Sequence, residues 1–127
     1  MRAVDTNVLV RLVVRDSPEQ ARLAESFIAS GAWVSHLVLA EAMWVLDAVY
    51  DRAPEQIASA IDMLLNHKDL TIQDAEVVTT ALGHFRKRPA LGFSDCLVLE
   101  IARKAGHTPL GTVDRDFAKL DGVKRLQ

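Results

Sequence analysis

Residues 31–50, GAWVSHLVLAEAMWVLDAVY, contain the pattern that decides the fold class. The stretch AWVS is rich in the β-branched and aromatic residues that favour strands, and Gly31 before it is a common helix terminator. Residues 37–50 follow at once and are so strongly apolar that they predict a buried helix. A short strand that passes directly into an apolar helix is the repeating unit of a parallel sheet covered by helices.

The same alternation of strand and helix extends over the whole chain. We predict further short strands at residues 2–5, 70–73, 108–112 and 123–127. We predict helices at residues 6–14, from the N-cap Ser17 to Gly31, at 54–66, 74–88, from 94 or 95 to 106, and a short one at 114–120. The chain of 127 residues is therefore expected to be one α/β domain, residues 1–127, with a single parallel sheet of about four to five short strands flanked by helices.

Composition excludes several classes of protein. Half of the residues are hydrophobic and the net charge is −2, so the chain has no overall basic signature for nucleic acid, although a local one remains open. Cys96 is the single cysteine and lies in an apolar run, which predicts a buried, inert thiol and fits the reducing cytoplasm. We see no signal peptide and no apolar run long enough to span a membrane, so we expect a cytoplasmic protein without a membrane partner.

Glu41 is the only charged residue between Leu37 and Leu46, and apolar residues lie on all sides of it. A lone buried carboxylate costs several kcal/mol unless something pairs with it. Two interpretations are open: Glu41 pairs with an arginine or caps a neighbouring group, or it reaches a metal ion at the edge of the sheet. Asp47, six residues further on, is expected on a different and solvated face of the helix.

Three more acids stand where parallel α/β folds place their chemistry. Asp5 follows the first predicted strand, Asp95 begins a helix, and Asp114 follows a later strand. Each one singly is well explained as a helix-capping or first-turn acid. Together with Glu41 they would meet at one edge of the sheet, where four carboxylates repel one another and need a counter-charge. Oxygen ligands alone favour Mg²⁺ or Mn²⁺ over zinc. The histidines have no metal-ligand spacing, so we expect them to be surface or incidental residues.

Four segments in this order resemble the motifs of PIN-domain ribonucleases: VDTNVLVRL, LVLAEAMWVL, GFSDCLVLEIARKAG and LGTVDRDF. The likeness is greatest to the VapC-type toxins of toxin–antitoxin pairs and spans nearly the whole chain. The resemblance implies that Asp5, Glu41, Asp95 and Asp114 are the catalytic residues and bind one or two Mg²⁺ or Mn²⁺ ions. It also implies hydrolysis of RNA to 5′-phosphate and 3′-hydroxyl ends, a homodimer, and a small antitoxin partner. Many members carry a further acid where this chain has Gly92, so a second ion is expected to be held weakly.

Polar and basic residues near the acids complete the predicted site. The side chains expected to support the four acids are Thr6, Asn7, Thr112 and Asp116. The cations expected to bind RNA phosphates are Arg11, Arg15, Arg86 and Arg115, although each one singly is equally well explained as a solvated charge.

The sequence leaves two alternative functions open. A catalytically degenerate PIN-like module that only binds a partner would keep the fold, but all four acids are present here. A phospho-receiver domain has similar length and a similar order of strands and helices. It needs paired acids after its first strand and a late lysine beside proline, whereas only Asp5 follows the first strand and Lys104 lies in a helix without such a proline.

Overall fold

The computed structural model describes all 127 residues and confirms the α/β class, with six α-helices and five short strands in parallel pairs. The strands are β1 (Arg2–Ala3), β2 (Ala32–Val34), β3 (Leu70–Ile72), β4 (Leu110–Thr112) and β5 (Val123–Arg125). The helices are α1 (Thr6–Val14), α2 (Pro18–Ile28), α3 (His36–Ala48), α4 (Pro54–Leu65), α5 (Ala75–Lys87) and α6 (Phe93–Lys104), with 3₁₀ turns η1 (Pro89–Leu91) and η2 (Phe117–Lys119). None of the helices combines the length and the apolar character needed to cross a membrane.

The strands belong to two sheets, where the sequence predicted one. The first sheet has the order β1-β2-β3, and β4 pairs with β5 in the second. The chain accordingly divides into two compact units, Met1–Ala75 and Glu76–Gln127, which we call unit 1 and unit 2. The prediction of a single sheet differs from the structure because strand pairing depends on long-range register, which strands of two or three residues do not encode.

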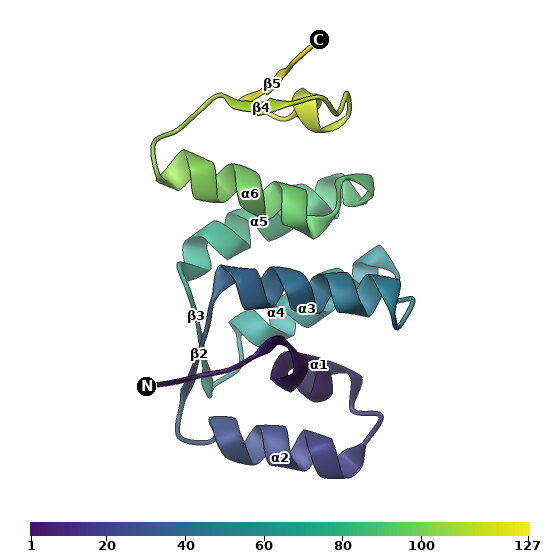
Figure 1. The fold of residues 1–127 in the computed structure, drawn as a ribbon, viewed down its shortest axis with the longest axis vertical. Coiled ribbons are helices and arrows are strands. Elements are labelled where there is room, and N and C mark those ends of the chain that lie inside the picture. The colour runs from purple at the N-terminus through teal and green to yellow at the C-terminus, as the bar shows by residue number, and fades with distance from the viewer. The chain divides into compact units, whose positions relative to one another are not determined.

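Unit 1 is built from strand–helix steps around a three-stranded parallel sheet (Figure 1). Two serines begin its helices: Ser17 Oγ accepts from the backbone N–H of Gln20 before α2, and Ser35 Oγ accepts from Val38 before α3. Such caps satisfy N–H groups that have no partner within the helix. The largest fully buried side chains of unit 1 are Leu9, Ile28, Leu39, Leu46, Ile61 and Leu64.

Helix α3 is not buried on all sides, which corrects the expectation from its apolar sequence. Leu39 and Leu46 point into the core at 1% exposure each, but Leu37 and Trp44 are 68% and 64% exposed. Glu41 lies between these two at helical spacing and is exposed as well. An exposed carboxylate is hydrated, so the argument that Glu41 needs a partner because it is buried does not hold.

Unit 2 joins two helices to the β4–β5 pair (Figure 1). The rings of Phe85 on α5 and Phe93 on α6 meet edge to face, with centroids 6.2 Å apart. Gly92 precedes α6 with φ +80°, a conformation that favours glycine, and the helix begins at Phe93, so Asp95 falls in the first turn. Cys96 is fully buried, as predicted, and burial, followed by the charge of Asp95, raises the pKa of its thiol to about 11.

Candidate active site

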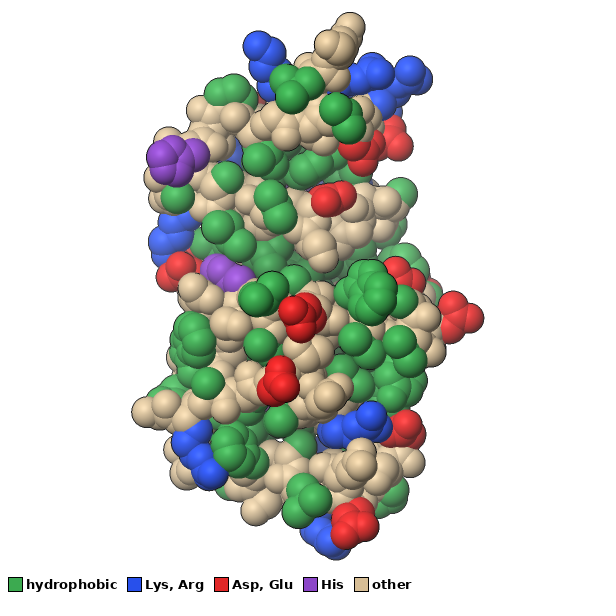
Figure 2. All heavy atoms as spheres, viewed as in Figure 1, with side chains coloured by type: hydrophobic (Ala, Val, Ile, Leu, Met, Phe, Trp, Pro, Cys, Tyr) green, Lys and Arg blue, Asp and Glu red, His purple; other side chains and the backbone are tan.

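Two of the four predicted acids lie in one cluster in unit 1. Asp5 is the N-cap of α1, and its Oδ1 accepts from the backbone N–H of Thr6 at 2.7 Å. Thr6 is buried, with 9% exposure, and its hydroxyl donates to Oε2 of Glu41 on α3 at 2.9 Å. Thr6 therefore connects the two acids across 35 residues of sequence, and acidic side chains are exposed over α3 and over the start of α1 in Figure 2.

The other two predicted acids lie in unit 2, where the charge of Asp114 acts on Asp95. Burial, and after it the negative charge of Asp114, raises the pKa of Asp95 above its ordinary value. The Asp114 backbone N–H donates to Thr112 Oγ1 at 3.1 Å, and Asp114 Oδ1 accepts from the Asp116 backbone N–H at 2.9 Å. The turn after β4 thus orients the Asp114 carboxylate. Thr112 and Asp116, two of the four residues predicted to support the acids, contact Asp114 in this turn.

None of the four acids has a basic partner, a property that they share with several other acids of the chain, Asp47 among them. Asp16, Glu25, Glu76, Glu100 and Asp116 each form an ion pair, whereas no lysine, arginine or histidine pairs with Asp5, Glu41, Asp95 or Asp114. Their donor atoms are carboxylate oxygens only, which suits a hard divalent cation. Two of the four lie in each unit, and no group of three or more His, Cys, Asp or Glu side chains lies close enough together to hold a metal ion.

Two of the predicted RNA-binding cations lie in ion pairs. Arg11 Nη1 is 2.8 Å from Asp16 Oδ1, and Arg15 pairs with Glu25. Arg86 stands in the last turn of α5, and Arg115 is exposed in the turn before η2. Their role in RNA binding stays a prediction.

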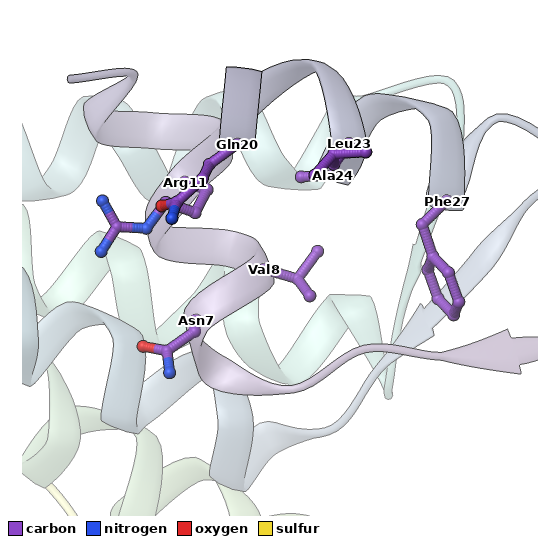
Figure 3. Close-up of a pocket in the computed structure, with 7 residues that line it drawn as sticks. All are labelled: Asn7, Val8, Arg11, Gln20, Leu23, Ala24 and Phe27. Carbon is purple, nitrogen blue, oxygen red and sulfur yellow. The ribbon is translucent and has the colours of Figure 1, made fainter. Parts of the chain in front are cut away.

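A cavity of about 480 Å³ lies between α1 and α2 in unit 1 (Figure 3). Asn7 and Arg11, one helical turn apart, line its α1 side, and Leu23 and Phe27 contribute apolar surface from α2. Asn7, predicted to support the acids, therefore faces this cavity, and no hydrogen bond joins it to Asp5 or Glu41.

Sequence reasoning missed a buried acid in unit 2. Glu100 is 6% exposed and pairs with His84 and Arg103. The expectation that the histidines are surface or incidental residues is wrong for His84, which binds Glu100, whereas His36 is buried at 8% exposure rather than at the surface. The available signal was the run CLVLEIA, in which Glu100 is the only charge and Arg103 follows three residues later.

Comparison with known protein families identifies the class to which the chain belongs. The family model of the PIN domain matches residues 2–123, which is nearly the whole chain. The chain therefore belongs to the PIN-domain family, whose members are generally nucleases and typically use divalent metal ions. Comparison with curated proteins and with solved structures found no significant match.

Proposed function

We propose that this PIN domain is a metal-dependent endoribonuclease, with Asp5, Glu41, Asp95 and Asp114 as ligands of one or two Mg²⁺ or Mn²⁺ ions. The observation that supports the proposal is the link through Thr6, which binds Asp5 with its backbone N–H and Glu41 with its hydroxyl, while neither carboxylate has a basic partner. The negative charges of Asp95 and Asp114 repel each other, and a bound cation would relieve this repulsion.

Neighbouring groups of the chain would hold the carboxylate ligands in position. The Thr6 hydroxyl holds Glu41 on α3, and the backbone N–H of Asp116 holds one oxygen of Asp114. When bound, a divalent ion supplies a Lewis acid that activates water and neutralises charge on the departing oxygen of the phosphodiester. Gly92 replaces the further acid of many relatives, so a second ion would have fewer protein ligands.

RNA cleavage with matched variants tests this proposal. Purified protein should cut members of a panel of single-stranded and structured RNAs with Mn²⁺ or Mg²⁺, and EDTA should stop the reaction. Glu41→Gln should abolish cleavage, whereas Asp47→Asn, which removes another exposed acid from α3, should retain it. Binding of RNA without cleavage under either metal would favour the degenerate binding module and overturn the enzymatic proposal.

We further propose that the chain is the toxin of a toxin–antitoxin pair, acting in the cytoplasm as a homodimer and inhibited by a small antitoxin. The support for this proposal is the resemblance of the four motifs to those of VapC-type toxins. Membership of the PIN family also argues against the alternative that the chain is a phospho-receiver domain. Induced expression should arrest bacterial growth, and Asp5→Asn should prevent the arrest. Co-expression of a short neighbouring open reading frame should restore growth, and light scattering should give twice the mass of one chain. Growth unaffected by the intact chain would contradict the toxin role.

A further inference from the structure

Glu100 is the most deeply buried acid of unit 2, and it has two partners on two helices. Its Oε2 accepts from His84 Nε2 on α5 at 2.9 Å and from Arg103 Nε on α6 at 3.2 Å. Both bonds go to the same oxygen of a buried carboxylate, one from an imidazole on α5 and one from a guanidinium on α6. Together they hold the carboxylate in one position. Glu100 therefore fixes the direction in which the Arg103 side chain extends from α6.

The far end of Arg103 contacts the segment that leads into β5. Arg103 Nη2 donates to the backbone carbonyl of Asp121 at 2.8 Å, and a Cβ added at Gly122 would lie only 3.0 Å from Nη1. The carbonyl of the same Gly122 accepts from the backbone N–H of Leu110 in β4 at 2.8 Å. The guanidinium thus packs against the backbone that pairs β4 with β5.

The β4–β5 pair carries Asp114, and α6 carries Asp95. Asp114 follows β4 by two residues and is oriented by Thr112, the last residue of that strand. Arg103 lies two helical turns after Asp95 on α6. A contact between Arg103 and the β4–β5 pair therefore acts on the separation between the two acids of unit 2.

We propose that Glu100 and Arg103, anchored to α5 by His84, are positioning residues that hold the β4–β5 pair against α6 and so set Asp95 and Asp114 at the separation a divalent cation needs. This inference rests on the proposed metal-dependent function. It assigns a role to an ion-pair network that is centred on the buried Glu100 and contains none of the four predicted ligands.

Arg103→Lys tests the proposal with a small change. Lysine keeps the positive charge but has one nitrogen, so it cannot bind Glu100 and the Asp121 carbonyl with the two ends of a planar group. We expect amide hydrogen exchange at Leu110 to accelerate at least about tenfold, since its partner is the Gly122 carbonyl. The Mn²⁺ concentration for half-saturation, measured by paramagnetic resonance of the free ion, should rise by roughly 10–100-fold, the usual range for loss of a residue supporting a metal ligand.

Gly122→Ala disturbs the same contact from the other side, because its methyl group would lie against the guanidinium and its φ of +86° is unfavourable for alanine. It should reproduce both effects, and the double variant should be little worse than either one, because neighbouring changes at one contact are not additive. Lys104→Gln is the matched control: it removes the exposed ion pair between Lys104 on α6 and Glu76 on α5 and should change neither measurement.

Faster exchange at Leu110 with unchanged Mn²⁺ half-saturation would show that the network only stabilises the fold and would overturn the proposal. Unchanged exchange in both Arg103→Lys and Gly122→Ala would overturn it as well, as would wild-type protein that binds no Mn²⁺. If wild-type protein binds Mn²⁺ but cleaves no RNA, the nuclease proposal fails and the positioning role is still decided by these two measurements.

Discussion

Replacing Thr6 by valine removes the hydroxyl that joins Glu41 to the start of α1 and keeps the branched shape of the side chain. A hydrogen bond to a charged group contributes about 1.5–3 kcal/mol, and its loss costs most where the charged group is buried and left without a partner. Glu41 is exposed, so water replaces the hydroxyl, and we expect a loss near the ordinary value of about 0.5–1.5 kcal/mol. For a chain of 127 residues, about 1 kcal/mol corresponds to a Tm change of roughly 4 °C.

The effect of Thr6→Val on metal dependence should be larger than its effect on stability. Without the hydroxyl, Glu41 is free to rotate away from Asp5, so the Mn²⁺ concentration for half-maximal cleavage should rise by roughly 10–100-fold. Thr6→Ser keeps the hydroxyl and should remain close to wild type. Mn²⁺ titrations of RNA cleavage, with thermal melts in EDTA, measure both quantities. Equal Mn²⁺ dependence for Thr6→Val and wild type would refute the supporting role of Thr6, and a stability loss above about 3 kcal/mol would refute the argument from the exposure of Glu41.

Three further predictions concern the proposed ligands Glu41, Asp114 and Asp95. Glu41→Gln should change the stability of the metal-free protein by no more than about 0.5 kcal/mol in a thermal melt, because its side chain is exposed; a large drop would indicate a structural ion pair. Asp114→Asn should remove detectable cleavage while Asp116→Asn retains roughly 1–10% at saturating Mn²⁺, and the opposite result would move the fourth ligand by two residues. Asp95→Asn should raise the Tm in EDTA at pH 7, because burial and the charge of Asp114 raise the pKa of Asp95 and so disfavour its ionised form. That gain should exist above the raised pKa and vanish as the pH falls below the ordinary value of 3.8, where the acid is neutral; an equal gain at both pH values would contradict this cause.

The order of helices and strands was predictable because it depends on local sequence patterns such as helix caps, apolar periodicity and glycines at helix ends. Ser17 and Ser35 precede apolar-periodic segments and do begin α2 and α3, and Gly31 follows the end of α2 with φ +97°. The division of the strands into two sheets was not predictable, since β3 and β4 are both three-residue segments, and nothing in such short segments shows that β3 pairs with β2 while β4 pairs with β5. Local patterns define elements, whereas the pairing of short strands is decided by the packing of the whole unit.

Glu41 and Glu100 show why burial of a single acid is difficult to predict. Each is the only charge in an apolar helical run, yet Glu41 is exposed and Glu100 is 6% exposed. Glu100 has Arg103 one helical turn away and His84 on a neighbouring helix, so its charge can be buried with compensation. Glu41 has no basic residue within one turn, which favours solvent. A basic residue three or four positions away is thus a better indicator of a buried acid than the apolarity of its neighbours.

The division of the chain into two units separates its natural spectroscopic probes. Both tryptophans, Trp33 in β2 and Trp44 in α3, belong to unit 1, whereas the only cysteine, Cys96, is buried in unit 2. The fluorescence of Trp33, which is 38% exposed, therefore reports the opening of unit 1 better than that of the more exposed Trp44, and the rate of thiol labelling of Cys96 reports the opening of unit 2. If the 127 residues form one cooperative domain, as the sequence predicts, both signals should change at the same urea concentration. Two separate transitions would mean that each half of the chain, with its own two acids, folds independently.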